Sequence, residues 1–143
     1  MHLKKLFWSL NIFVPLIIGL AVYIFFKRGT YINSLISLNM GEVPSCFVIQ
    51  IIIYWGCDFL WAYSLVFTLY RGLYSLKNGL IYSALSAVLC GIFFELFQYA
   101  GYINGTFDFF DIFAEITAVI IAVVIIKKSP VVIRQDRSGK KIK

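Results

Sequence analysis

The stretch GIFFELFQYAGYINGTFDFFDIFAEITAVIIAVVII, residues 91–126, decides the fold of this chain. It reads as the second half of one membrane helix, a tight turn and a complete second membrane helix, because long apolar runs flank the turn. Five acidic or amide side chains lie inside or beside these runs: Glu95, Gln98, Asp108, Asp111 and Glu115. An ionised carboxylate near the centre of a bilayer costs about 2.5–3.5 kcal/mol. We therefore expect these acids to be protonated, hydrated or bound to a ligand.

The composition is that of a membrane protein. Hydrophobic residues make up 61% of the chain and charged residues only 14%, whereas soluble domains contain about 45–50% and about 25%. The three cysteines form no CxxC pair, and the only histidine is His2. These features argue against a disulfide framework and against a zinc site, so we expect no metal and no cofactor.

Four apolar runs predict an all-α membrane protein, built as a bundle of four transmembrane helices. They belong to one transmembrane domain, residues 1–128, which is followed by a basic tail, residues 129–143. A cleaved signal peptide is the alternative for the first run, but no small-residue cleavage site follows it. Each run is close to the roughly 20 residues that cross a bilayer, and the predicted spans are residues 6–26, 46–70, 80–100 and 108–126.

The basic residues give the expected orientation. All thirteen Lys and Arg lie outside the apolar runs, and eleven of them fall on one side if both termini are cytoplasmic, as the positive-inside rule requires. The net charge of +6 therefore describes a membrane rim and not a nucleic-acid surface. We expect the tail to bind anionic lipid head groups, and segment 31–40 to lie flat at the membrane interface.

Two helices are expected to bring the acids together. Glu95 and Gln98 share one helical face, while Asp108, Asp111 and Glu115 are spaced by three and four residues and share another. The outer ends of both helices meet at the turn that joins them. The acids should therefore line a polar cleft that opens to the outside of the membrane and narrows inward.

Several of these acids also have a structural interpretation. Asp108 opens a helix and is equally consistent with an N-cap. Asp58, near the middle of the second span, would alternatively be a buried acid bonded to hydroxyls of neighbouring helices, with Trp55 and Trp61 walling it or facing lipid. Glu95 and Asp111 would alternatively form a hydrogen bond with each other or with Gln98, and this bond would only fix how the helices pack. Because ionisable residues inside membranes are usually functional, we favour a ligand site.

The segments ELFQ, residues 95–98, and DFFDIFAE, residues 108–115, resemble the core of the VanZ-like family. That family shows Glu-x-x-Gln, a turn, and Asp-x-x-x-Asn on the next helix. The match places Glu95, Gln98 and Asp111 on its Glu, Gln and Asp. Members are small bacterial membrane proteins, and the founding member is linked to low-level teicoplanin resistance.

The chain departs from this family pattern mainly where the family has bases. The Arg of the family's turn has no counterpart near Gly105, and the family's Asn is Glu115 here. The Asp-Lys and His of the family's earlier span are matched only by Asp58 and Tyr63. The site is therefore more acidic than the family pattern, and a role that needs Arg or His is in doubt.

Three functions are consistent with the sequence. The resemblance implies a protein of the bacterial cytoplasmic membrane that binds an amphiphile, a lipoglycopeptide or a lipid-linked cell-wall precursor in the acidic cleft, and so influences glycopeptide antibiotic susceptibility. A metal-dependent enzyme on a lipid pyrophosphate would use paired acids, but no nucleophile, His or Arg completes a catalytic constellation. A subunit of a proton- or cation-coupled transporter would use acids at two depths and would need to oligomerise. We expect membrane lipids as partners and the following ligand-binding residues: Glu95, Gln98, Asp111, Glu115, Asp58, Tyr63 and Asp108.

Overall fold

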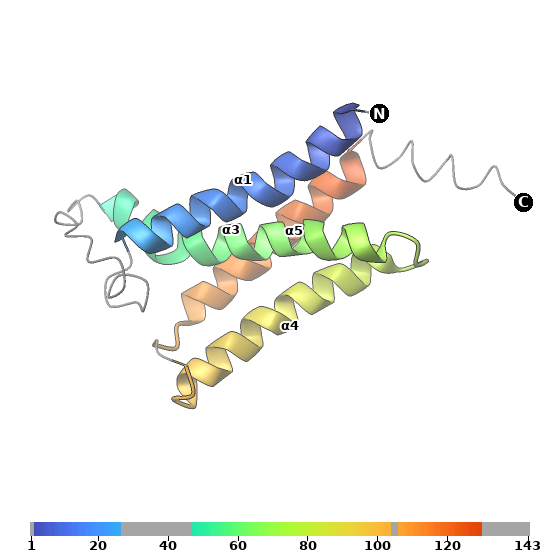
Figure 1. The fold of residues 1–143 in the computed structure, drawn as a ribbon. Helices are drawn as coiled ribbons and strands as arrows, with labels where there is room; N and C mark the ends of the chain where they lie inside the picture. Colours follow the sequence, from blue (N-terminus) through green and yellow to red (C-terminus); the bar gives the residue numbers. More distant parts are fainter. Residues whose placement is uncertain (1, 27–46, 104–105, 130–143) are drawn as a thin grey trace, which may run out of the picture.

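The computed structural model describes residues 2–26, 47–103 and 106–129, and all regular structure in this part of the chain is helical (Figure 1). This confirms the predicted all-α class, and each helix overlaps one predicted span. The expected interfacial segment 31–40 and residues 130–143 of the basic tail lie outside the described residues. The helices are α1 (His2–Phe26), α3 (Phe47–Leu73), α4 (Gly79–Tyr99) and α5 (Phe109–Lys128).

Three of the described helices are long and apolar enough to cross a membrane: α1 over Lys5–Ile24, α4 and α5. The chain is therefore a membrane protein. Helix α3 has 27 residues and carries Gln50 and Asp58, and it is not among these three. That α3 also crosses the membrane, and that both termini are cytoplasmic, stay predictions.

Helix α3 lies at the centre of the bundle. It packs against α1, α4 and α5, and α4 and α5 also pack against each other. Phe67 of α3 and Ala118 and Ala122 of α5 have no exposed surface. Small residues allow helix backbones to approach closely in a membrane, so the alanines of α5 explain how it fits against its neighbours. Helix α3, which carries Gln50 and Asp58 within its apolar run, is thus the helix that packs against the most other helices.

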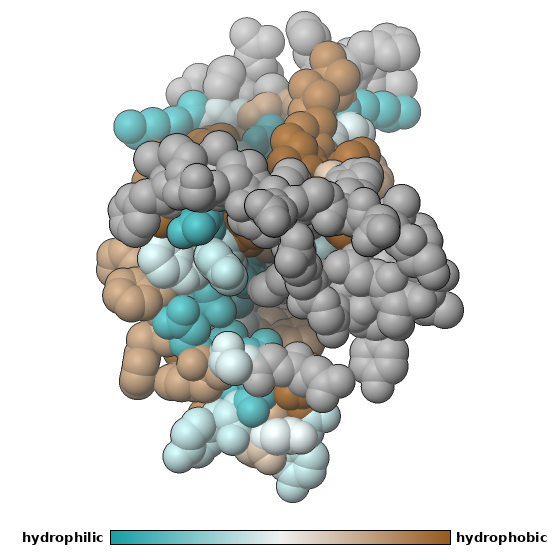
Figure 2. All heavy atoms as spheres, turned by 90° about the vertical axis from the view of Figure 1, so that its left-hand side faces the viewer, coloured by the Kyte–Doolittle hydropathy of each residue, from teal (hydrophilic) through white to brown (hydrophobic). Residues whose placement is uncertain are grey.

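The described charges separate along the bundle. The N-terminus, the α3–α4 connection and the end of α5 lie at the same end, which we call the basic end (Figure 1). The acids lie between the middle of the bundle and the opposite end, which we call the acid end. Figure 2 faces the acid end, where hydrophilic side chains gather between hydrophobic ones. The basic side chains described at the basic end are Lys5, Arg71, Lys77, Lys127 and Lys128.

The turn between α4 and α5 is closed by hydrogen bonds that recur at helix C-termini. The N–H of Tyr102 donates to the Phe97 carbonyl at 2.9 Å, and the N–H of Gly101 donates to the Gln98 carbonyl at 3.0 Å. Gly101 has φ +76°, a left-handed conformation that glycine adopts without a Cβ clash. The rings of Phe97 and Tyr102 pack edge to face across the turn. This compact reversal places the start of α5 beside the end of α4.

Candidate ligand site at the acid end

Glu95 joins the end of α4 to the start of α5. Only 5% of Glu95 is exposed, and its Oε2 accepts a hydrogen bond from the backbone N–H of Asp108 at 3.0 Å. Asp108 is the N-cap of α5, and its Oδ1 accepts the N–H of Phe110 at 2.9 Å. Free N–H groups at a helix start favour negative charge, so two carboxylates stabilise this start. The N-cap interpretation of Asp108 is confirmed.

Helix α3 contributes Trp55 to the same place. Its indole Nε1 donates to Asp108 Oδ2 at 3.5 Å, and its ring lies against Phe110 with centroids 5.1 Å apart. Trp55 therefore walls the site at Asp108, whereas the prediction from the sequence concerned a wall around Asp58. Trp61 is half exposed and lies against Gly19 of α1, away from this contact.

Glu115 lies over the backbone of α4. A Cβ built on Gly91 would overlap the Glu115 carboxylate, with Oε1 only 2.6 Å away, so glycine is what permits this approach. The Glu115 carboxylate interacts electrostatically with Asp58 of α3, Glu95 of α4 and Asp111 of its own helix. Four carboxylates from three helices therefore share one region. We call these four, together with Asp108, the acid cluster.

The remaining predicted site residues lie differently. Gln98 is half-buried one turn beyond Glu95, and its side chain makes no hydrogen bond to another described residue. Tyr63 is buried, and its hydroxyl donates to Asn11 Oδ1 of α1 at 2.5 Å. The structure thus unites all five predicted acids, while Tyr63 takes part in the contact between α1 and α3.

A second polar region, which we call the α1–α3 seam, was not predicted. Besides the bond between Asn11 and Tyr63, the Ser64 hydroxyl donates to the Ile12 carbonyl at 2.7 Å. The Cys57 thiol donates to the Gly19 carbonyl at 3.4 Å. Asn11, an amide within the first apolar run, was the available signal for this seam, because a half-buried amide needs a partner.

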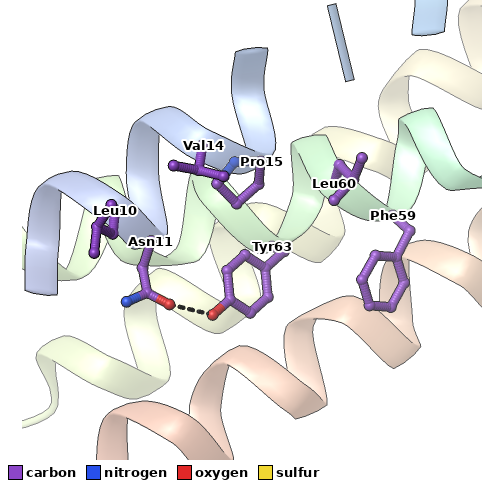
Figure 3. Close-up of a pocket in the computed structure, with 7 residues that line it drawn as sticks. All are labelled: Leu10, Asn11, Val14, Pro15, Phe59, Leu60 and Tyr63. Carbon is purple, nitrogen blue, oxygen red and sulfur yellow. Dashed lines mark hydrogen bonds between the residues drawn. The ribbon is translucent and has the colours of Figure 1, made fainter. Parts of the chain in front are cut away.

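The seam borders an open groove on the bundle (Figure 3). The groove has a volume of about 480 Å³ and is lined by two helices. In Figure 3 the Asn11 and Tyr63 side chains meet across it. The lining residues are Leu10, Asn11, Val14 and Pro15 of α1 and Phe59, Leu60 and Tyr63 of α3.

The acid cluster does not have the arrangement of a metal site. Among the described residues, no three His, Cys, Asp or Glu side chains are placed to hold one metal ion together. The Oε2 atom of Glu95 accepts a backbone N–H. The enzyme alternative that depends on such a cation therefore gains no support from the geometry.

No protein-family model, curated protein or solved structure matches this chain. The resemblance to the VanZ-like family therefore rests on the quoted residues alone. What the chain does must accordingly be argued from the acid cluster, the seam and the groove.

Proposed function

We propose that this chain is a membrane protein that binds the cationic head group of an amphiphile in its acid cluster. The observation that carries the proposal is the position of Glu115, whose carboxylate interacts with three other carboxylates. Like charges repel more strongly in a medium of low dielectric constant than in water. A positively charged group placed among these acids would relieve that repulsion, so the cluster favours a cation as its ligand.

The surroundings of the acid cluster favour an amphiphile over a small hydrated cation. Phe109, Phe110 and Phe113 are largely exposed on the first turns of α5, beside Asp111. Aromatic rings attract organic cations through their π faces, and they are compatible with lipid. A ligand with a positive head and an apolar body would satisfy both the carboxylates and the rings.

The resemblance supplies the finer form of this proposal. Glu95 and Gln98 on one helix and Asp111 after the turn follow the VanZ-like pattern. Accordingly we propose a four-span protein of the bacterial cytoplasmic membrane with both termini inside and the acid end outside. Its amphiphile would be a lipoglycopeptide or a lipid-linked cell-wall precursor that offers a positively charged amino group to the acid cluster. The presence of the protein would alter susceptibility to glycopeptide antibiotics.

The test is binding of dodecyltrimethylammonium to the purified protein in maltoside micelles, measured by the shift in melting temperature. Glu115→Gln and Asp111→Asn should each weaken binding at least about tenfold, which corresponds to about 1.4 kcal/mol. Asp136→Asn, in the basic tail, is the matched control and should leave binding unchanged. Equal affinity in all four proteins would show that the acid cluster is not the head-group site.

Coupled transport is the second candidate, because the cluster reaches from the N-cap of α5 to Asp58 near the middle of α3. Acids at two depths are typical of ion pathways. In a susceptibility assay, Glu95→Gln and Asp111→Asn should abolish the phenotype under the first proposal, and Asp58→Asn should be milder. If Asp58→Asn alone is damaging, and it also stops proton uptake into proteoliposomes, the transport function replaces the binding function.

A further inference from the structure

The groove between α1 and α3 has the chemistry of a hydrocarbon site. Its two polar side chains satisfy each other, since Tyr63 donates to Asn11 Oδ1 and Asn11 Nδ2 donates to the Phe7 carbonyl at 2.8 Å. The other lining side chains carry no polar atoms. A bound water needs two to four polar partners, which this groove does not offer. Its volume of about 480 Å³ lies within the roughly 300–1,000 Å³ typical of small-molecule sites.

Residues of α3 that line the groove share a helical face with a residue that contacts the acid cluster. Trp55, Phe59 and Tyr63 are four residues apart and therefore lie on the same helical face. Phe59 and Tyr63 line the groove, and Trp55 donates to Asp108 in the acid cluster. One helical turn, about 6 Å, separates Phe59 from Trp55. The apolar groove and the acidic site are therefore neighbours on a single surface of the central helix.

The groove lies beside hydrocarbon. Leu10 and Val14 stand at 49% and 42% exposure on α1, in a segment that is apolar enough to cross a membrane. A chain can therefore enter the groove sideways from the lipid. A head group without a chain, such as tetramethylammonium, would not fill the groove, and chains of the surrounding lipid would occupy it.

We infer that the groove binds the hydrocarbon chain of the same amphiphile whose cationic head group the acid cluster takes. This inference rests on the proposed function and adds the ligand class, a long-chain amine or quaternary ammonium compound that lies along α3. The head is held beside Trp55 and Asp111, and the chain runs toward Pro15 and Tyr63. Chains of ordinary lipids are as apolar as the groove and would fit it equally well. The positively charged head group is therefore what selects this ligand over other lipids.

Photo-crosslinking tests where the chain lies. The probe is an alkyltrimethylammonium compound of twelve carbons with a diazirine at mid-chain, applied to the full-length protein in maltoside micelles and mapped by peptide mass spectrometry. Adducts should concentrate on Leu10, Val14 and Leu60, and excess unlabelled dodecyltrimethylammonium should remove them. A neutral diazirine alcohol of the same length should label lipid-facing surfaces diffusely and should not be displaced.

Two variants on α1 provide the structural control. Val14→Trp fills the groove from its exposed rim, so the groove adducts should fall at least about fivefold, while the affinity for tetramethylammonium is unchanged. Ile17→Trp adds the same ring at an exposed position outside the groove and should leave the adducts in place. Leu10→Trp repeats the filling test if Val14→Trp does not fold.

The outcomes separate the inference from the proposed function. If Asp111→Asn abolishes ammonium binding but the adducts map to the outer faces of α4 or α5, the head-group site stands and the groove inference is wrong. If the neutral alcohol displaces the ammonium probe from the groove and Asp111→Asn changes nothing, the groove takes any lipid chain. That result overturns the proposed function together with the shared ligand.

Discussion

The α1–α3 seam and the acid cluster both place polar side chains inside a helical bundle, but they do so with opposite chemistry. In the seam each donor meets an acceptor, as Tyr63 meets Asn11 and Ser64 meets the Ile12 carbonyl. In the cluster like charges face one another, because Glu115 interacts with three further carboxylates. One region pairs donors with acceptors within the chain, whereas the other also gathers like charges that a cation or protons would neutralise.

This difference separates polar groups that pair with each other across helices from carboxylates whose crowding favours a cationic ligand. Interhelical hydrogen bonds in membranes contribute modestly to stability, about 0.6 kcal/mol on average. Crowded acids lower the stability of the ligand-free protein, and the protein regains this stability when a cation binds among them. Substitutions in the seam should therefore change stability without changing head-group binding. Substitutions in the cluster should change stability and head-group binding in opposite directions, except where an acid also supports the backbone.

The largest effect is expected for Gly91→Leu. The leucine side chain would occupy the space of the Glu115 carboxylate, so α4 and α5 must separate or Glu115 must move. We expect unfolding free energy to fall by roughly 3 kcal/mol, at the upper end of overpacking effects. Thermal unfolding in micelles measures it. Gly72→Leu is the control, because a Cβ at Gly72 meets nothing within 4 Å.

A double variant decides whether the carboxylate is the cause of this loss. Gly91→Leu combined with Glu115→Ala removes the overlapping group, so part of the lost stability should return. Neighbouring positions that share a contact show such coupling, typically 0.5–3 kcal/mol. Additive losses would mean that Gly91 is required for another reason and that Glu115 does not lie over α4.

The next largest effect is expected for Glu95→Ala. It removes the acceptor of the Asp108 N–H and leaves a partly buried donor without its partner, which costs about 1–3 kcal/mol. Glu95→Gln keeps an oxygen at this position and should lose less than half as much. Chemical denaturation compares the two. If both variants lose the same stability, the charge of Glu95, and not its acceptor, supports the start of α5.

Glu115→Gln is expected to act in the opposite direction. Glutamine at position 115 avoids the cost of burying a carboxyl group beside Asp58, Glu95 and Asp111. The ligand-free protein should therefore gain about 0.5–2 kcal/mol of stability, as substitutions that relieve functional strain often do. Affinity for the ammonium probe should fall in the same variant. A loss of stability would show that Glu115 is a structural residue. The acid cluster would then hold the fold, as the seam does.

The sequence predicted the helices and the acid cluster because both follow from local rules. Apolar runs near 20 residues indicate membrane helices, and the spacing of Asp108, Asp111 and Glu115 sets one helical face. The turn between α4 and α5 then brings Glu95 beside them. The N-cap role of Asp108 was likewise readable from its place before an apolar helix.

The seam and the close approach at Gly91 could not be predicted in the same way. Both depend on which helices are neighbours, and periodicity within one helix does not contain that information. The partner of Asn11 depends on α1 lying against α3, and Tyr63 was grouped with the acids because the resemblance to the VanZ-like family set it, with Asp58, against polar residues of that family's earlier span. The Tyr63 hydroxyl bonds Asn11 of α1, a contact that depends on the tertiary packing of the two helices.

The smallest effect is expected for Tyr63→Phe, which removes the hydroxyl from Asn11 and keeps the ring against Phe67. The loss should be close to the 0.6 kcal/mol average and below about 1.7 kcal/mol, because Asn11 Nδ2 keeps its bond to the Phe7 carbonyl. Tyr54→Phe, at an exposed position of the same helix, should change nothing. Binding of tetramethylammonium, which has only the head group, should be equal to that of the unmodified protein, since the seam and groove do not contact the head group. If Tyr63→Phe weakened head-group binding as strongly as Asp111→Asn, the seam would belong to the ligand site and the contrast between the two regions would be lost.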